Sequence, residues 1–308
     1  MSGIMIKYVP GLLLLFLITT CTKSIERSDK LNIFVSILPQ KYFVERIAGD
    51  NAKVHVMVLP GHSPATYEPI PSQMKEISEA DIYFRIGVPF EETWMKKLKQ
   101  LNPELEVIDT REGITLRPMD SFITLQQQMA HRRNEGQKEN HDHTNQKDPH
   151  IWLSPDLVKI QARTICKNLQ LIDPENSDFY YDNLQNFLDE LTSLQHYFEE
   201  HLSQLDRKEF LVFHPSWGYL ADEFGMIQIP IQIEGKTPAP RQLAEIIAYA
   251  KKENIRVIFV QKQFSTSAAQ TVAQAIQGKV ILINPLAENY ITNMRSIANV
   301  FKEVLDEE

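Results

Sequence analysis

Three histidines in this sequence occupy positions where a folded α/β chain would place ligands. His62 and His214 each follow a short apolar run of β type, and His150 lies just before Ser154 and Pro155. Ser and Pro together are typical of a helix start, because Ser caps the first turn and Pro fits within it. In open α/β sheets, ligands bind beyond the carboxyl ends of the strands. Because imidazole is a preferred ligand of zinc, copper and nickel, the three side chains predict a site for a divalent transition metal.

Two amide side chains follow strand-like runs in the second half of the chain. Asn284 comes after the run 280–283 and offers a neutral oxygen ligand, whereas Gln261, after 257–260, is interpreted as a polar residue of the cleft. Three imidazoles and one amide would leave both positive charges of the ion uncompensated, so water, hydroxide or a carboxylate is expected to complete the shell. The candidate carboxylates are Glu68, Glu234 and Glu288. The imidazoles must be deprotonated to bind, so metal affinity is expected to fall below a pH of about 6.5.

The elements that must position these residues alternate between short β-type runs and longer helical patterns, which is typical of parallel sheets covered by helices. Strands are expected in the first half at 31–36, 53–59, 82–86 and 106–109, with helices at 39–49, 72–80 and 89–101. Strands are expected in the second half at 209–213, 226–233, 257–260 and 280–283. The pattern predicts two α/β lobes, each with a four-stranded sheet.

Helical spacing without an internal Pro or Gly predicts a long helix between the two lobes, at about 175–205, after a shorter helix at 155–172. The long helix would measure about 45 Å, more than the width of a small lobe. A strut joining the lobes is one interpretation, and a coiled-coil or ordinary packing helix is the other. The polar stretch 126–147 is expected to be a surface loop, with weak auxiliary metal binding by His131, His141 and His143.

The N-terminus has the layout of an export signal. Lys7 precedes an apolar run that is too short to span a bilayer, and small polar residues then lead to Cys21. The segment Ile18-Thr19-Thr20-Cys21 resembles a bacterial lipobox, which would make Cys21 the lipidated first residue of the mature chain. Cys166 is the one other cysteine, so a disulfide framework and a cysteine-based zinc site are excluded.

Composition excludes one class of partner. The 308 residues include 32 basic and 40 acidic side chains, for a formal net charge of −8. A nucleic-acid partner would need a basic face to meet its phosphates, which this balance does not favour. The chain is expected to be a monomer.

Several stretches together resemble the zinc and manganese solute-binding lipoproteins of bacterial ABC importers, from about Leu31 to Phe301. The matching stretches are PGHSPATYEPIPSQ (60–73), ADIYFRIGVPFE (80–91), DPHIWLSP (148–155), FHPSWGYLADEFG (213–225), IEGKTPAPRQL (233–243), VIFVQKQFS (257–265) and INPLAENY (283–290). The resemblance implies two Rossmann-like lobes around a long linking helix, with metal bound between them and passed to an ABC permease. The implied division is a signal at 1–21, a first lobe at 31–172, a linking helix at 175–205 and a second lobe at 206–308. The implied location is periplasmic or at the cell surface, on a lipid anchor.

Carried over residue by residue, the resemblance assigns His150 to the ligand of the family's D-P-H-x-W motif and His214 to the ligand after the first strand of the second lobe. The latter position is His in zinc members and Glu in manganese members, so His214 favours Zn²⁺ over Mn²⁺. Two positions depart from the pattern. The family's first ligand falls at Ala65, which leaves His62 as its substitute, and the family's last ligand, an Asp, is Asn284 here.

Three other interpretations stay open beside a binding protein without a reaction to catalyse. The first is a manganese-binding member of the same family. The second is a zinc hydrolase, for which Asn284 leaves an open coordination position but which lacks an H-E-x-x-H, a paired carboxylate or a G-x-S-x-G motif. The third is a surface lipoprotein or adhesin whose metal site has degenerated.

Overall fold

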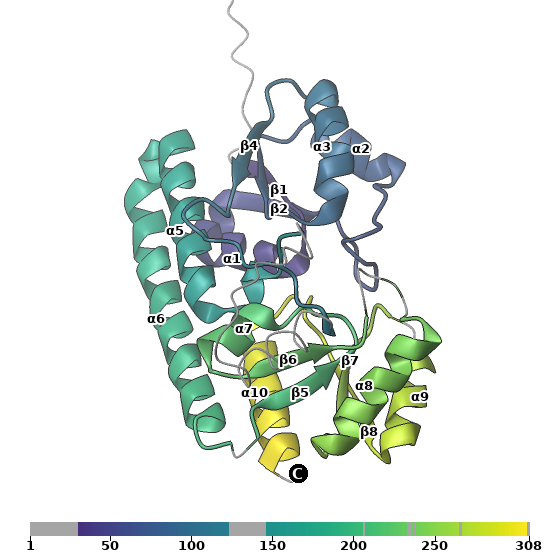
Figure 1. Ribbon diagram of the computed structural model, residues 1–308. Helices are drawn as coiled ribbons and strands as arrows, with labels where there is room; N and C mark the ends of the chain where they lie inside the picture. The colour runs from purple at the N-terminus through teal and green to yellow at the C-terminus, as the bar shows by residue number, and fades with distance from the viewer. Residues whose placement is uncertain are drawn as a thin grey trace, which may run out of the picture.

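The computed structural model describes residues 30–122, 146–205, 207–232, 236, 238–264 and 267–306. These residues form two lobes, one above the other in Figure 1, with two long helices along one side. Each lobe contains one four-stranded parallel sheet, so the predicted α/β class is confirmed. Some residues singled out from the sequence lie outside the described residues, namely Cys21, His131, His141, His143 and Glu234.

The first lobe is built on a sheet with the strand order β2-β1-β3-β4. Its strands are β1 (Leu31–Val35), β2 (Ala52–Val56), β3 (Ile82–Arg85) and β4 (Glu106–Asp109). Its helices are α1 (Leu38–Ala48), α2 (Pro71–Ile77) and α3 (Pro89–Leu101), each with Pro in its first turn, where a missing N–H costs no hydrogen bond. All four expected strands are present, although β2 ends three residues earlier than predicted.

The second lobe repeats this order as β6-β5-β7-β8. Its strands are β5 (Glu209–Val212), β6 (Ile227–Pro230), β7 (Val257–Gln261) and β8 (Lys279–Ile283). Its helices are α7 (Gly218–Glu223), α8 (Pro240–Lys252), α9 (Ser267–Ile276) and α10 (Tyr290–Asp306). Central β7 is buried along its whole length, as expected for a strand covered on both faces, whereas edge strand β8 is partly exposed. Edge strand β6 ends at Pro230, earlier than the expected 233, although the N–H groups of Ile231 and Gln232 still donate to the carbonyls of Val212 and Phe213 at 2.8 Å.

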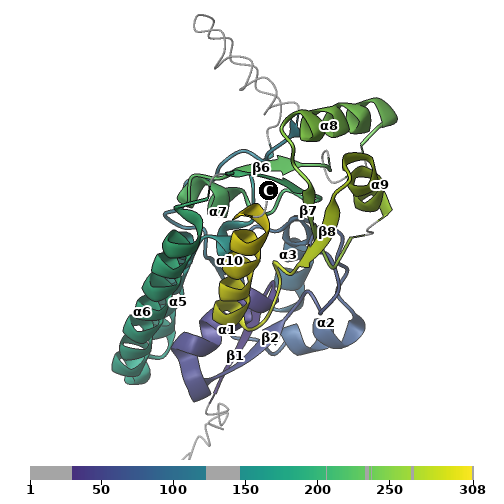
Figure 2. The ribbon, with the colours of Figure 1, turned by 90° about the horizontal axis from the view of Figure 1, so that it is seen from below.

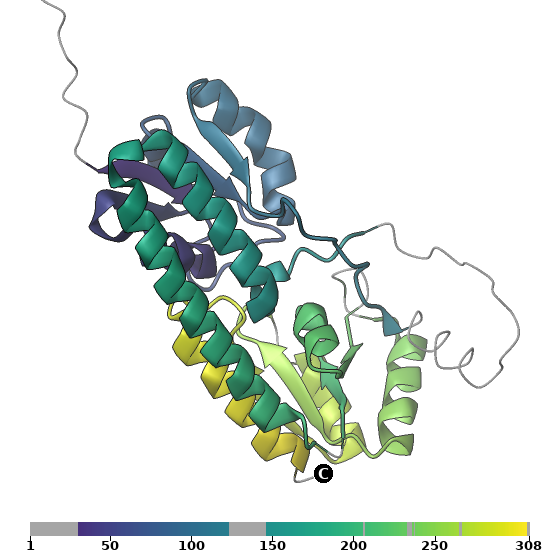
Figure 3. The same cartoon turned by 90° about the vertical axis from the view of Figure 1, so that its left-hand side faces the viewer.

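Two helices lie along both lobes. Helices α5 (Pro155–Ile172) and α6 (Ser177–Leu202) pack against each other, and α6 also contacts α1 of the first lobe and α10 of the second. Figure 3 shows α6 running past both lobes, and Figure 2 shows α10 beside it while α8 and α9 lie farther away. The predicted long helix therefore spans both lobes. It starts later than expected, because Pro174–Asn176 forms a separate 3₁₀ turn. None of the helices in the described ranges is long and apolar enough to cross a membrane.

Two further contacts join the lobes near their boundary. After β4 the chain crosses to the second lobe, where Phe122 is buried beside Tyr249 with their ring centroids 5.7 Å apart. Nearer the boundary, the backbone of Pro118 pairs antiparallel with that of Lys147. Farther along, the Trp152 indole donates a hydrogen bond of 2.8 Å to the Pro285 carbonyl. The segment 146–153 is thus held to both lobes immediately before α5 begins.

The packing of α6 should dominate the stability of the first lobe. Phe187 is fully buried on α6 and contacts the rings of Tyr42 and Phe43 on α1. Phe187→Ala is therefore expected to lower the free energy of unfolding by about 3–5 kcal/mol, because it leaves a cavity between the helices. The control Asn186→Ala, at the adjacent exposed position, should change it by no more than about 0.5 kcal/mol. Urea denaturation measures both, and equal midpoints would contradict this account of α6.

Candidate metal centre

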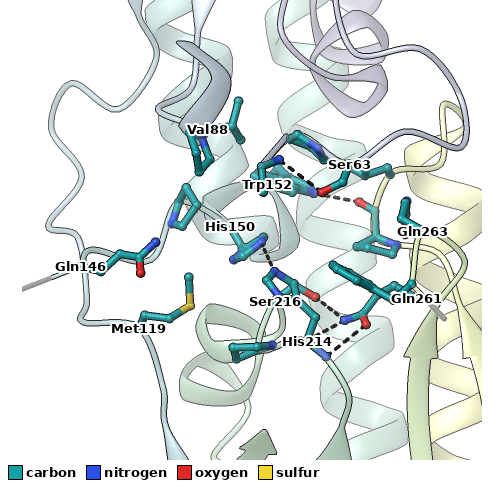
Figure 4. Close-up of a pocket in the computed structure, with 18 residues that line it drawn as sticks. Ser63, Val88, Met119, Gln146, His150, Trp152, His214, Ser216, Gln261 and Gln263 are labelled. Carbon is teal, nitrogen blue, oxygen red and sulfur yellow. Dashed lines mark hydrogen bonds between the residues drawn. The ribbon is translucent and has the colours of Figure 1, made fainter. Parts of the chain in front are cut away.

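A pocket of about 270 Å³ lies between the two lobes. The loop after β2 contributes Ser63 and Ala65, the segment before α5 contributes His150, and the ends of β5 and β7 contribute His214 and Gln261 (Figure 4). This is where the carboxyl ends of parallel strands place ligands in α/β folds. Among the described residues that line the pocket, none is Asp, Glu, Lys or Arg. Whatever binds here meets neutral donors and apolar walls.

Two imidazoles face each other at the centre of this pocket. The Nε2 atoms of His150 and His214 are 3.3 Å apart, and the ring planes cross at 75°. The other nitrogen of each ring is already engaged. Nδ1 of His150 is 2.7 Å from the Asp148 carboxylate, and Nδ1 of His214 is 2.9 Å from the side-chain oxygen of Gln232. Both partners are acceptors, so both Nδ1 atoms must donate.

These hydrogen bonds fix which nitrogen of each neutral ring has the lone pair. With the proton on Nδ1, Nε2 of both His150 and His214 is an unprotonated acceptor, and two acceptors oppose each other. A cation between them removes that conflict. Zinc bonds to imidazole at about 2.0–2.1 Å in a tetrahedron, which requires ligand atoms about 3.3–3.4 Å apart. The observed separation of 3.3 Å fits two corners of such a tetrahedron.

His150 is held by a buried carboxylate. One oxygen of Asp148 accepts hydrogen bonds from both the backbone N–H and Nδ1 of His150, at 3.0 and 2.7 Å. The other Asp148 oxygen lies 3.6 Å from the guanidinium of Arg117, and the Tyr219 hydroxyl donates to the Asp148 carbonyl. A carboxylate behind a metal-binding imidazole orients the ring and increases its basicity. Arg117 approaches so closely to Gly218 that a Cβ there would lie 1.5 Å from the guanidinium.

His214 is held by neutral groups. The buried side chain of Gln261 donates hydrogen bonds to the His214 carbonyl at 2.7 Å and to the Ser216 hydroxyl at 2.9 Å. Its oxygen accepts from the His214 N–H at 3.3 Å. The ring of Phe264 stacks on the imidazole with centroids 4.9 Å apart. Gln261 is thus a polar residue of the cleft, as interpreted from the sequence, and it fixes the backbone at His214.

Two residues that orient the rings, Asp148 and Gln232, were not among the residues singled out from the sequence. Asp148 had a local signal, because it lies two residues before His150 in the D-P-H-x-W motif. Gln232 had none, because it follows β6, and its closeness to His214 depends on how β5 and β6 pair.

The structure does not bring His62 and Asn284 to the facing imidazoles. Both line a neighbouring pocket of about 400 Å³, which also includes Glu288 and shares Gln263 and Leu286 with the first pocket. His62 is exposed and lies against the Tyr67 ring, with centroids 5.5 Å apart.

The side-chain oxygen of Asn284 accepts a hydrogen bond from the Leu286 N–H at 3.1 Å. Of the two candidate glutamates in the described part of the chain, Glu68 is exposed, and Glu288 forms an ion pair with Lys41. Over that same part, no three side chains of His, Cys, Asp or Glu converge closely enough to hold a metal.

Burial changes the protonation of one ligand candidate. Desolvation, reinforced by the nearby His150, lowers the pKa of His214 from its usual 6.5 to about 4, although the hydrogen bond to Gln232 opposes the shift. His214 therefore stays neutral, and able to bind metal, well below the pH of about 6.5 expected for a free imidazole.

Known proteins match this chain along most of its length. The family model described as ZnuA, zinc-uptake complex component A, periplasmic, matches residues 33–304. The zinc-binding lipoprotein AdcA of Streptococcus pneumoniae is 28% identical over 96% of this chain, which spans only 59% of that relative. The high-affinity zinc uptake system protein ZnuA of Bacillus subtilis is 27% identical over 84% of this chain and 80% of its own. A crystal structure of a ZnuA deletion mutant with zinc bound superposes with a TM-score of 0.81 at 38% identity, covering 91% of this chain and 100% of that one.

The lowered pKa of His214 has a consequence for stability without metal. Between pH 6.5 and about 4 the unfolded chain takes up a proton at His214 that the folded chain does not. Stability from this group is therefore complete above pH 6.5 and is lost as pH falls towards 4, by roughly 3 kcal/mol at most. Urea unfolding of chelator-treated protein at pH 7 and 4.5 measures the loss. His214→Gln should show a smaller loss, and an equal loss in both proteins would refute the assignment.

Proposed function

Because this chain belongs to the ZnuA family of zinc-uptake components, we propose that it is an extracytoplasmic protein that binds one zinc ion between its lobes and delivers it to the membrane permease of an ABC importer. The family is one of substrate-binding proteins and not of enzymes. Relatives named for zinc binding and zinc uptake support the choice of ion, as does the zinc-bound structure at 38% identity.

The observation that supports this function best is the pair of opposed Nε2 atoms of His150 and His214. Their separation suits tetrahedral zinc, and their tautomers are fixed by partners that do not touch the ion. Imidazole nitrogen also favours zinc over manganese, which prefers carboxylate and carbonyl oxygen. The described lining of this pocket offers no carboxylate.

We propose His62 and Asn284, which line the neighbouring pocket, as candidate ligands for the positions of the tetrahedron that the two imidazoles leave open. The loop after β2 places Ser63 and Ala65 in the pocket of the facing imidazoles and His62 in the adjoining one. Gly61 in this loop has a φ of +84° and open space around it, so the loop can turn there without a steric clash. Bringing the His62 imidazole to the facing pair requires such a change in the conformation of this loop.

Zinc content and competitive zinc affinity of the chain without residues 1–21 test this function. One tightly bound zinc is expected. His150→Ala and His214→Ala should each weaken binding by more than the roughly 10–100-fold typical of residues behind a ligand. His62→Ala should weaken it as well, and the exposed control His196→Ala should not. Unchanged zinc binding in His150→Ala or His214→Ala would refute the proposed site.

We further propose that Cys21 is lipidated and that the exported protein acts as an anchored monomer. Cys21→Ser should therefore release the protein into the soluble fraction after detergent partitioning, whereas the native sequence should remain with the detergent phase. Recovery of both proteins in the same phase would exclude the anchor.

A further inference from the structure

Gln263 lines the pocket of the facing imidazoles and lies in a turn that a backbone hydrogen bond closes. β7 ends at Gln261, and the Phe264 N–H donates to the Gln261 carbonyl at 3.1 Å, which closes a four-residue turn with Gln263 inside it. The next residue, Phe264, stacks on the His214 ring. In Figure 4, Gln261 and Gln263 lie on one side of the pocket, with Met119 and Gln146 on the other.

The side-chain oxygen of Gln263 is buried and has no hydrogen-bond partner. Buried acceptors in proteins are almost always paired, because an unpaired one has lost its water without a replacement. An amide oxygen in this situation needs either a donor or a cation.

Three other side-chain oxygens of the same pocket are already engaged. The Ser63 hydroxyl accepts from the Ala65 N–H, the Ser216 hydroxyl accepts from Gln261, and the Gln261 oxygen accepts from the His214 N–H. The oxygen of Gln263 is free, and its side chain also lines the neighbouring pocket that contains His62 and Asn284. Gln263 therefore has access to both pockets that contain ligand candidates.

We propose that Gln263 is a ligand of the bound ion, supplying its amide oxygen beside the two imidazoles of His150 and His214. This inference rests on the proposed zinc binding and adds a donor that neither the motifs nor the imidazoles indicate. Zinc accepts oxygen as well as nitrogen ligands. The amide oxygen would occupy a third of the four tetrahedral positions, in a pocket whose described lining has no carboxylate, and would leave the fourth position to either His62 or Asn284. It would also satisfy the buried acceptor.

The test compares Gln263→Leu and Gln263→Glu with the control Gln146→Leu, which makes the same change on the far side of the same pocket. Gln263→Leu should weaken zinc binding by at least about tenfold. Gln263→Glu should restore binding and raise the affinity for manganese relative to zinc, because carboxylate oxygen suits manganese. Replacing zinc with cobalt(II) gives a direct signature, since its visible absorption depends on the number and type of ligands. The cobalt spectrum should change in Gln263→Leu and stay unchanged in Gln146→Leu.

Equal zinc affinity and identical cobalt spectra for the native protein and Gln263→Leu would overturn the role of Gln263 while leaving zinc binding intact. Loss of affinity in Gln263→Leu that Gln263→Glu does not restore, with an unchanged cobalt spectrum, would also overturn it, because a purely structural effect explains that result. Absence of zinc from the native protein would overturn both this inference and the proposed function.

Discussion

Two imidazole nitrogens face each other 3.3 Å apart, and neither has a proton in the neutral rings. This repulsive arrangement is the main constraint on the site. Neither ring can relieve it by rotation, because Asp148 and Gln232 hold the opposite edges. Two fixed acceptors facing each other in an uncharged pocket are unfavourable until a cation lies between them. The surroundings thus prepare the site for a metal before any metal arrives, and little reorganisation is needed on binding.

The rest of the fold holds the rings of His150 and His214 at this separation. His214 stands at the end of β5, where Gln261 of the adjacent strand β7 fixes its backbone. His150 stands on the segment before α5, and that segment is joined to the second lobe by Trp152 and Pro285. Helix α6 packs against helices from both lobes. The relative placement of the lobes therefore sets the distance between the imidazoles of His150 and His214. An ion bound by both imidazoles would add a further link between the segment before α5 and the second lobe.

The sequence predicted the parts of this arrangement that are local. The strands and helices follow from apolar runs and from prolines in first turns, and His150 and His214 follow from motifs at strand and helix boundaries. The sequence does not indicate the separation of His62 from these residues, because the direction of the short loop 60–66 depends on tertiary contacts, such as that of His62 with Tyr67, rather than on spacing. It could not reveal Gln232 or Gln263 either. A polar side chain after a strand becomes significant only when tertiary packing shows which atom it faces and whether that atom is already paired.

Binding of one zinc ion by both imidazoles is tested most directly by a crystal structure of the zinc-loaded protein with diffraction data collected at the zinc absorption edge. One anomalous peak is expected within bonding distance, about 2.0–2.1 Å, of Nε2 of both His150 and His214, with Asp148 and Gln232 still bonded to the opposite ring nitrogens. A peak bonded to only one of these imidazoles, or to neither, would contradict it.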